Sequence, residues 1–345
     1  MSKLNTFGIS VNAKFFVEIH SEADLKELFS AQEFKNNKRV FLGGGSNVLF
    51  TKDFDGLVVL NKLKGKEILE ENLKNVVVRC MGGEIWHDLV TFAVERGLWG
   101  IENLSLIPGT VGAAPMQNIG AYGVELKNVL ENVEAFDVDT GEKKIFSKEE
   151  CELGYRDSIF KNRLKNKYFI TAVTLILSKV ENKNITYKIL QDYLEKNKIN
   201  IKSSEASPAR LQLRDISNAV SAIRKSKLPD PRIVGNAGSF FKNVFIEREK
   251  MKKLLVTFPD MPYFRDEENE SKVPVLVKIP AGWLVEQTGW KGKRMGNVGV
   301  HGKQALVLVN HGGATGEEIL TLANKIIADV KEKFGLELIP EVNLI

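Results

Sequence analysis

Long apolar runs and cysteines are both scarce in this sequence of 345 residues, and their scarcity excludes several classes of protein. The apolar stretches, such as 172–177, are far shorter than the ~20 residues of a transmembrane helix, so we expect no membrane insertion. Two cysteines, Cys80 and Cys151, cannot build a disulfide framework, which favours a reducing, cytoplasmic environment. The first residues lack the charged and apolar regions of a signal peptide, and we expect none.

Metal-ligating patterns and basic stripes are also missing from the sequence. The four histidines show no ligand spacing with the cysteines, so we expect no metal site. The net charge of +5 is spread along the chain without interleaved aromatic residues, so we expect no nucleic-acid partner. This mild positive charge suits an anionic small molecule as substrate. No feature of the sequence implies an obligate protein partner.

The composition is that of an ordinary globular protein, and the length corresponds to two or three domains. Apolar periodicity predicts helices at 21–29, 85–94, 209–227, 247–257 and 315–334, with capping-box-like starts at 21–24 and 315–318 and with Gly97 as the cap of the second helix. It predicts strands at 40–42, 57–60, 76–80, 133–138, 168–177, 275–279 and 305–310. The polar segment 181–210 is interpreted as an insertion or a mobile flap, and the proline-containing segment 228–231 as a domain junction. This mixture indicates an α+β chain.

Residues 43–47 form the first of three glycine-rich segments. They follow a predicted strand, and their backbone N–H groups are suited to binding an anion. No Gly-Lys-Ser/Thr follows, so the segment is not a Walker loop, and it lacks the spaced glycines of the dinucleotide fingerprint. A pyrophosphate cradle of another design and a simple tight turn both remain open.

The second glycine-rich segment, 101–123, has four glycines, two prolines and neither helical nor strand periodicity. A loop this long inside a compact domain is either functional or disordered, and its near lack of charge argues against disorder. Its backbone around Ala113, Ala114, Gln117 and Asn118 is suited to lie flat against a ring system.

The third glycine-rich segment, 235–243, places the hydroxyl of Ser239 among residues with almost no side chain. Glycines at 235 and 238 allow the backbone to approach a ligand closely. Ser239 is therefore a candidate to hydrogen-bond or to donate a proton to a large, flat ligand. The alternative is a glycine-rich turn that leads into a strand.

Three charged residues are candidates for a site, although each has an ordinary structural explanation. Arg156, between Tyr155 and Asp157, offers a planar fork that grips a carboxylate at two points, or it forms a structural ion pair. Glu341 near the chain end and Lys227 before Pro229 are, taken alone, solvated charges.

Seven segments in order along the chain resemble the UDP-N-acetylenolpyruvoylglucosamine reductase family, in its longer class with a Tyr-bearing insertion. They are 43–50, 102–123, 154–161, 227–231, 235–243, 281–292 and 340–342. The resemblance implies an α+β fold with a two-subdomain FAD-binding part of the vanillyl-alcohol-oxidase/PCMH type and a C-terminal α+β substrate-binding domain. It implies a first subdomain at 1–68 joined by the tail 336–345, a second at 69–228 and the substrate-binding domain at 229–335.

The same resemblance implies the cofactor FAD, the co-substrate NADPH and a UDP-sugar enolpyruvyl ether as substrate. Ser239 would donate the proton, and Arg156 and Glu341 would flank the enolpyruvyl carboxylate. Residues implied to bind FAD are Gly43, Gly44, Gly45, Ser46, Asn47, Pro108, Gly109, Thr110, Gly112, Ala113, Asn118, Gly120 and Gly123. Residues implied to bind the substrate are Tyr155, Tyr187, Lys227, Asn243 and Gln287. The match around Tyr187 is loose.

Two other functions are compatible with parts of the sequence. A flavin-dependent oxidase of a small alcohol or sugar would need a base, and a His or Cys to tether the flavin. His87 is the candidate near the early loops, but we expect it in the middle of a helix. A catalytically silent flavin-binding module would have a damaged site, yet Ser239, Arg156 and Glu341 are all present.

Overall fold

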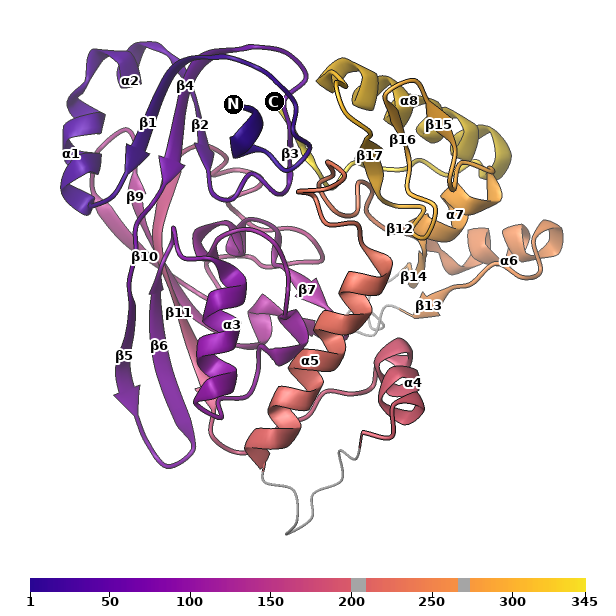
Figure 1. Ribbon diagram of the computed structural model, residues 1–345, viewed down its shortest axis with the longest axis horizontal. Coiled ribbons are helices and arrows are strands. Elements are labelled where there is room, and N and C mark those ends of the chain that lie inside the picture. The colour runs from indigo at the N-terminus through magenta and orange to yellow at the C-terminus, as the bar shows by residue number, and fades with distance from the viewer. Residues whose placement is uncertain (200–208, 266–273) are drawn as a thin grey trace. The chain divides into compact units, whose positions relative to one another are not determined.

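The computed structural model describes residues 1–199, 209–265 and 274–345, and its contacts divide them into two compact units (Figure 1). The larger unit comprises 13–45 and 54–226, and the smaller unit comprises 1–12, 46–53 and 227–345. Each unit therefore joins segments that are distant in the sequence. Among the described residues, no helix combines the length and apolar character that spanning a bilayer requires.

The larger unit begins with a small parallel sheet of order β1-β4-β2, formed by Ala13–Ile19, Phe54–Asn61 and Lys38–Leu42. Helices α1 (Glu22–Ser30) and α2 (Gln32–Asn36) follow β1. Ser21 and Asp24 close a capping box at the start of α1, as the sequence predicts. Leu25 of α1 and Phe34 of α2 are fully buried in the same core as the sheet residues Ile19 and Val59.

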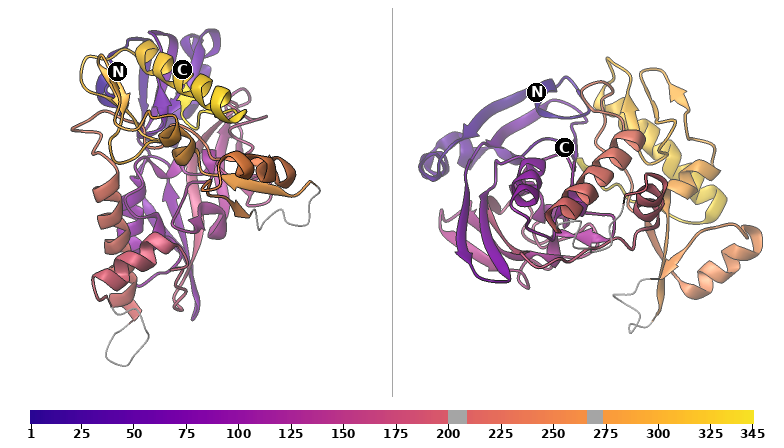
Figure 2. Two further views of the ribbon diagram at one scale, coloured as in Figure 1. Left: turned by 90° about the vertical axis from the view of Figure 1, so that its right-hand side faces the viewer. Right: turned by 60° about the horizontal axis from the view of Figure 1, so that its bottom comes forward.

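A five-stranded antiparallel sheet of order β10-β9-β11-β6-β5 forms the other layer of the larger unit. Its strands are Lys143–Ser147, Leu130–Asp137, Tyr168–Ser178, Asn75–Met81 and Lys66–Glu71. Burial alternates along β6, and its inward side chains pack in one core with α3 (Trp86–Glu95) and α5 (Ala209–Lys227). These two helices lie side by side (Figures 1 and 2).

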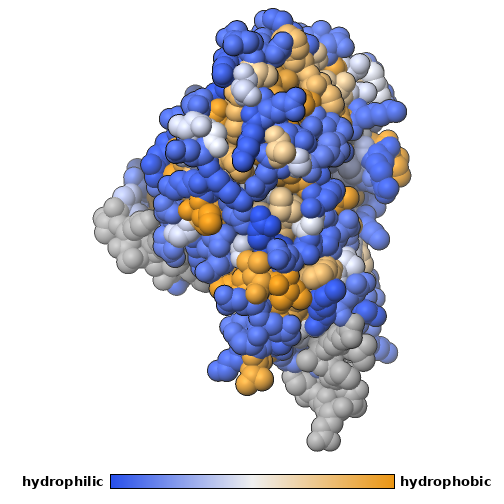
Figure 3. Space-filling model, turned by 90° about the vertical axis from the view of Figure 1, so that its left-hand side faces the viewer, coloured by the Kyte–Doolittle hydropathy of each residue, from blue (hydrophilic) through white to orange (hydrophobic). Residues whose placement is uncertain are grey.

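Several short elements and one further helix complete the larger unit. They are η2 (Glu102–Leu104), η3 (Val111–Ala113), η4 (Pro115–Gln117), η5 (Leu126–Asn128), β7 (Gly120–Ala121), β8 (Val124–Glu125) and α4 (Lys188–Lys196). The face shown in Figure 3 is mostly hydrophilic and carries separate apolar patches. The exposed apolar side chains of the five-stranded sheet are Ile68, Leu69, Ile145 and Ile176.

Glu134 of the five-stranded sheet lies between two cations. Its carboxylate accepts a hydrogen bond from Arg79 Nη2 at 2.8 Å and lies 2.9 Å from Lys143 Nζ. The hydrogen bonds from Arg79 hold the pKa of the Glu134 carboxyl at about 2, although burial acts in the opposite direction. The lowered pKa means that folding favours the ionised carboxylate.

We therefore expect this network to stabilise the larger unit above pH 4.5 and to lose its contribution as the pH falls to about 2. As the pH falls, the Glu134 carboxyl of the unfolded chain is protonated before that of the folded chain. The free energy of unfolding should therefore decrease by up to about 3 kcal/mol. Urea unfolding across this range measures it. Glu134→Gln should flatten the acid limb, whereas the exposed Glu131→Gln on the same strand should leave it intact. An unchanged acid limb in Glu134→Gln would contradict the assignment.

The smaller unit contains two small antiparallel sheets. One has the order β12-β14-β13, formed by Val244–Glu247, Leu276–Ile279 and Phe264–Arg265, and the other joins β15 (Arg294–Met295), β16 (Val298–Val300) and β17 (Leu308–Asn310). Its helices are η1 (Ser2–Leu4), α6 (Arg248–Thr257), α7 (Ala281–Gln287) and α8 (Gly316–Phe334). The final strand β18 (Asn343–Leu344) pairs in parallel with β3 (Val48–Leu49).

Most of the predicted elements are confirmed. The helix predicted at 209–227 is α5, and α8 begins with the predicted capping box of Thr315 and Glu318. Gly97, in the left-handed region, follows the end of α3 as expected. The predicted flap contains α4, which the sequence analysis missed, and its part at 200–208 lies outside the described residues. The three-domain division stays a prediction, because the contacts give two units and the larger one has two separate cores.

Candidate active site

Two glycine-containing loops, 43–45 and 109–113, pack closely against each other in the larger unit. A Cβ on Gly44 would lie 2.9 Å from Gly109 Cα, and a Cβ on Gly43 would collide with the Thr110 hydroxyl. Gly45 has a φ of 60°. Only glycine permits this close approach, and it leaves backbone groups open to a ligand. Two of the three glycine-rich segments thus meet. Ser46 and Asn47, the remainder of the first segment, belong to the smaller unit.

A pocket in the larger unit adjoins this pair of loops. Its wall combines bare backbone and small side chains with aromatic rings, at Gly43, Gly112, Ala113, Phe41, Tyr168 and Phe169. The Oγ1 atom of Thr110, another lining residue, is buried and has no hydrogen-bond partner within the described ranges. A buried hydroxyl without a partner is unfavourable, so this atom is suited to contact a bound polar group.

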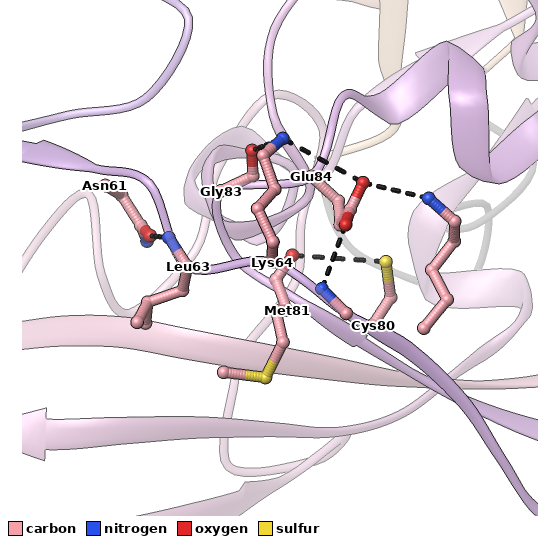
Figure 4. A network of polar contacts seen from close by, with 9 residues as sticks. Asn61, Leu63, Lys64, Cys80, Met81, Gly83 and Glu84 are labelled. Carbon is pink, nitrogen blue, oxygen red and sulfur yellow. Dashed lines mark hydrogen bonds and ion pairs between the residues drawn. The ribbon is translucent and has the colours of Figure 1, made fainter. Parts of the chain in front are cut away.

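The turn 82–84 holds the 109–113 loop through backbone hydrogen bonds. Val111 N donates to Glu84 O at 2.9 Å, and Gly112 N donates to Gly82 O at 2.9 Å. The Glu84 carboxylate in turn accepts hydrogen bonds from Gly65 N at 2.9 Å and Lys66 Nζ at 2.8 Å. Lys64 donates to Gly83 O at 2.6 Å, as Figure 4 shows. Burial alone would raise the pKa of the Glu84 carboxyl, but these hydrogen bonds lower it.

Sequence reasoning missed this supporting network. The adjacent glycines at 82 and 83 were the available signal, because a Cβ on Gly83 would meet the backbone of Leu63 at 2.6 Å. The spacing of Glu84 from the two lysines gives no such indication.

Asn118 braces the loop from inside. Its side chain is fully buried on a left-handed backbone with φ of 42°. Its Nδ2 donates to Glu125 Oε2 at 2.8 Å and to Gly154 O at 3.0 Å, and its Oδ1 accepts from Lys127 N at 3.0 Å. Because the side chain makes these contacts within the protein, a ligand would meet the backbone of Asn118.

Arg156 is held against the same turn. Its Nη2 donates to Gly120 O at 2.7 Å, and its Nη1 lies 4.0 Å from Glu125 Oε1. The guanidinium also lies 5.3 Å from the centre of the Tyr155 ring. Arg156 has a φ of 52°, a left-handed conformation that often marks functional sites. The structure therefore brings Arg156, from the 154–161 motif, together with Asn118 and Gly120, which both belong to the 102–123 motif.

Tyr187 contacts the loop through a ring. It precedes α4, is 45% exposed, and makes a T-shaped contact with Tyr122 at 5.5 Å. Asn184 Nδ2 donates to the carbonyl of Gly123 at 2.9 Å, and Asn103 Nδ2 donates to the carbonyls of Tyr122 and Asn184. Sequence reasoning missed both asparagines, whose contacts span up to 81 residues.

Ser239 and Glu341 come close together within the smaller unit. Their segments pair as antiparallel strands through a bridge between Phe241 and Pro340. Glu341 N donates to Phe240 O at 2.7 Å, one residue from Ser239. Asn47 Nδ2 donates to Glu341 O at 3.4 Å. Ser239 is half-buried, and its hydroxyl makes no hydrogen bond with any residue that the structure describes.

The remaining substrate candidates lie at ends of helices. Asn243 Oδ1 accepts from Ala281 N at 3.1 Å at the first residue of α7. Gln287, the last residue of α7, is exposed, and its carbonyl accepts from Lys333 Nζ at 2.6 Å. Lys227 is the half-buried last residue of α5. Arg156, Tyr155 and Tyr187 belong to the larger unit, and the other catalytic and substrate candidates belong to the smaller one. In the described residues no group of His, Cys, Asp and Glu could hold a metal ion.

Comparison with known proteins finds two family models along this chain. Residues 13–146 match the FAD binding domain, and residues 230–345 match the C-terminal domain of UDP-N-acetylenolpyruvoylglucosamine reductase. The protein of that name from Flavobacterium johnsoniae is 47% identical, over 100% of this chain and 98% of its own length. The one from Pseudomonas aeruginosa is 44% identical, over 99% and 96%.

A solved structure agrees with the fold. The crystal structure of UDP-N-acetylenolpyruvylglucosamine reductase from Thermus caldophilus superposes with a TM-score of 0.65 at 24% identity, covering 99% of this chain and 96% of that one. The fold class predicted from the sequence is confirmed.

Proposed function

This chain belongs to the family of UDP-N-acetylenolpyruvoylglucosamine reductases, and on that premise we propose that Ser239, Arg156 and Glu341 are its catalytic residues. The protein is an FAD-dependent oxidoreductase with NADPH as co-substrate. It reduces the enolpyruvyl group of UDP-N-acetylglucosamine enolpyruvate to give UDP-N-acetylmuramate in peptidoglycan precursor synthesis.

The residues of the larger unit fit the cofactor. The backbone groups of the glycine-containing loops 43–45 and 109–113 are suited to contact the pyrophosphate and ring of FAD. The buried Thr110 hydroxyl is suited to contact a polar group of the ligand. Bound FAD would supply the hydride chemistry that links NADPH to the methylene carbon of the substrate. We assign the other contacts predicted from the sequence to the same cofactor, at Ser46, Asn47, Pro108, Asn118, Gly120 and Gly123.

Ser239 supplies the proton of the reaction. Hydride addition at the methylene carbon leaves an electron pair on the neighbouring carbon, conjugated into the carboxylate. The Ser239 hydroxyl donates its proton to that carbon and so completes the saturated C–C bond. Serine is a weak acid, but the carbon that it protonates is strongly basic at that point. A positioned acid of this kind contributes about 10²–10⁴-fold to the rate.

Arg156 stabilises the charge that develops on the substrate carboxylate, and Glu341 flanks the same group. Two carboxylates would repel each other there unless Arg156 pairs with both or Glu341 carries a proton. Arg156 is suited to grip the two carboxylate oxygens, and a fixed cation where charge develops is a strong source of catalysis. The pairing of the Ser239 and Glu341 segments in the smaller unit is the observation that best supports this assignment. Tyr155, Tyr187, Lys227, Asn243 and Gln287 are proposed to bind the uridine diphosphate sugar, whose negative charge suits Lys227.

The small-molecule substrate requires no protein partner, and we propose none. The thiols of Cys80 and Cys151 are free and buried, which agrees with action in a reducing cytoplasm.

Incubation of the protein with NADPH and UDP-N-acetylglucosamine enolpyruvate tests the function. We expect NADPH oxidation that depends on the sugar nucleotide, and a product heavier than the substrate by two hydrogen atoms in mass spectrometry. NADPH oxidation that proceeds without the sugar nucleotide and consumes oxygen would contradict it.

Gly44→Ala tests the cofactor cradle. The added methyl group would press on the Gly109 backbone, and overpacking of this kind costs about 1–3 kcal/mol. We expect FAD to bind roughly tenfold or more weakly to the deflavinated variant, as measured by FAD fluorescence. Gly302→Ala, which adds a methyl group in open space, is the control. Equal FAD affinity in both variants would show that 43–45 is an ordinary turn.

A further inference from the structure

The segment that enters the 109–113 loop has an unusual backbone at Leu106. Its φ of 58° lies in the left-handed region, which residues with a Cβ rarely adopt. Leu106 stands two residues before Pro108 and is neither glycine nor asparagine, the residues that tolerate this conformation best. Contacts from elsewhere must therefore hold it.

Two side chains from different helices bind the peptide groups of Leu106. The N–H of Leu106 donates to His87 Nδ1 at 3.0 Å, and His87 is the second residue of α3. The carbonyl of Leu106 accepts from Arg224 Nε of α5 at 3.2 Å. Both backbone polar groups of this residue are thus satisfied by side chains, and the expectation that His87 lies in the middle of its helix was wrong.

The residues around Leu106 are attached to the same two helices. The Trp86 indole of α3 donates to Leu104 O at 3.0 Å, and the Trp86 backbone N–H donates to Gly109 O at 3.1 Å. On the other side, the hydroxyls of Ser105 and Ser217 lie 2.8 Å apart, and Ser217 belongs to α5. Among these contacts, the one with His87 depends on the protonation state of a side chain.

We propose that His87 is a positioning residue for the FAD-binding loop, in which its neutral imidazole accepts the N–H of Leu106 and fixes the backbone conformation before Pro108. The proposal rests on the assignment of FAD to the 109–113 loop. His87 acts through Leu106, and nothing in the proposal requires it to touch the cofactor or the substrate.

Protonation would abolish this contact, because both ring nitrogens of an imidazolium ion are donors. The charged groups that face His87 are Asp88 on its own helix and Arg224 and Lys225 on α5. Burial lowers the pKa of His87 and the two cations lower it further, against the effect of Asp88. Histidine is the residue type in this cluster whose ordinary pKa lies between about pH 5 and 8.

FAD should therefore bind with full affinity above the ordinary histidine pKa of about 6.5 and more weakly as the pH falls below it. Protonation of His87 opposes FAD binding, because the FAD-bound conformation of the loop requires the neutral imidazole. Because the pKa of His87 is lowered, the decline in FAD affinity should occur below the ordinary histidine pKa.

Three variants test the proposal through the dissociation constant of FAD, measured by fluorescence on deflavinated protein between pH 5 and 8. His87→Ala should bind FAD about tenfold more weakly at pH 7.5, since the Leu106 N–H loses its acceptor. His87→Asn places Oδ1 near the position of Nδ1 and cannot be protonated. It should remain within about threefold of the parent and be independent of pH. The exposed His20→Asn is the control and should keep the affinity and pH dependence of the parent.

Replacing Leu106 with glycine separates the effect of His87 on the backbone conformation from its effect on packing. With Leu106→Gly the left-handed backbone is no longer strained, so adding His87→Ala should weaken FAD binding by less than about threefold. An equal loss from His87→Ala in both backgrounds would overturn the role of Leu106. If His87→Ala does not fold, the pH profile of His87→Asn decides the matter alone.

Two results would overturn the proposal itself: parent-like pH dependence in His87→Asn, or parent-like affinity in His87→Ala. A parent protein that binds no FAD at any pH would instead refute the cofactor assignment on which the proposal rests. The two failures are thus distinguishable.

Discussion

Ser239→Ala is expected to lower the turnover number by about 10²–10⁴-fold, the loss typical of a removed general acid. The reason is local, because the alanine variant cannot donate the proton that the substrate carbon needs after hydride addition. The Ser239 hydroxyl makes no hydrogen bond within the described part of the chain, so its removal should leave the stability of the protein nearly unchanged.

Rapid-mixing absorbance measurements separate the two halves of the reaction in this variant. Bleaching of the flavin band by NADPH should keep the parent rate, because it requires no proton at the substrate carbon. Its return on addition of the sugar nucleotide should be slow. Ser226→Ala, which removes a hydroxyl bound to the carbonyl of Ile223, is the control. Turnover of Ser239→Ala within a few-fold of the parent would show that another group is the acid.

Arg156→Lys is expected to lower kcat/KM by about 10²–10³-fold, although the positive charge is retained. Lysine is a point charge, and it cannot reproduce the planar two-point grip on a carboxylate. It would also lose the hydrogen bond from Nη2 to Gly120 O, so the ammonium would not be held against the 118–125 turn.

Steady-state rates with saturating NADPH and varied sugar nucleotide measure this effect. Arg163→Lys, at an exposed ion pair with Glu152, is the matched control and should be silent. FAD content of Arg156→Lys should match that of the parent, and its stability should fall by no more than the loss of one hydrogen bond, about 1 kcal/mol. Near-normal catalysis in Arg156→Lys would reduce Arg156 to a structural brace for the turn.

Local features of the fold were readable from the sequence because their causes lie within a few residues. The capping boxes at Ser21 and Thr315 specify the starts of two helices, and the apolar stripe of 315–334 specifies the buried face of α8. The segment 188–196 was different. It lies in the polar stretch 181–210, whose lysine- and asparagine-rich composition resembles that of a flap, yet Leu190 and Leu194 are buried in the same core as α3 and α5 and stabilise α4.

The chemistry of the site was readable as separate motifs, but its geometry was not. The closeness of Ser239 and Glu341 arises from strand pairing between Phe241 and Pro340, about a hundred residues apart in the sequence, which no local pattern encodes. The same holds for the hydrogen bonds of Asn118 with Glu125 and Gly154, and for the contact of His87 with Leu106. Apolar periodicity predicted which face of α3 is buried, but it did not predict the residue at which the helix begins.

The central claim is that this chain carries reducing equivalents from NADPH to a sugar-nucleotide enol ether through bound FAD. The visible spectrum of the purified protein, recorded without oxygen, tests it most directly. The flavin band should bleach on addition of NADPH and return on addition of UDP-N-acetylglucosamine enolpyruvate. A band that returns only with oxygen would indicate an oxidase. A colourless protein that also does not bind added FAD would contradict the assignment of FAD to the loops 43–45 and 109–113.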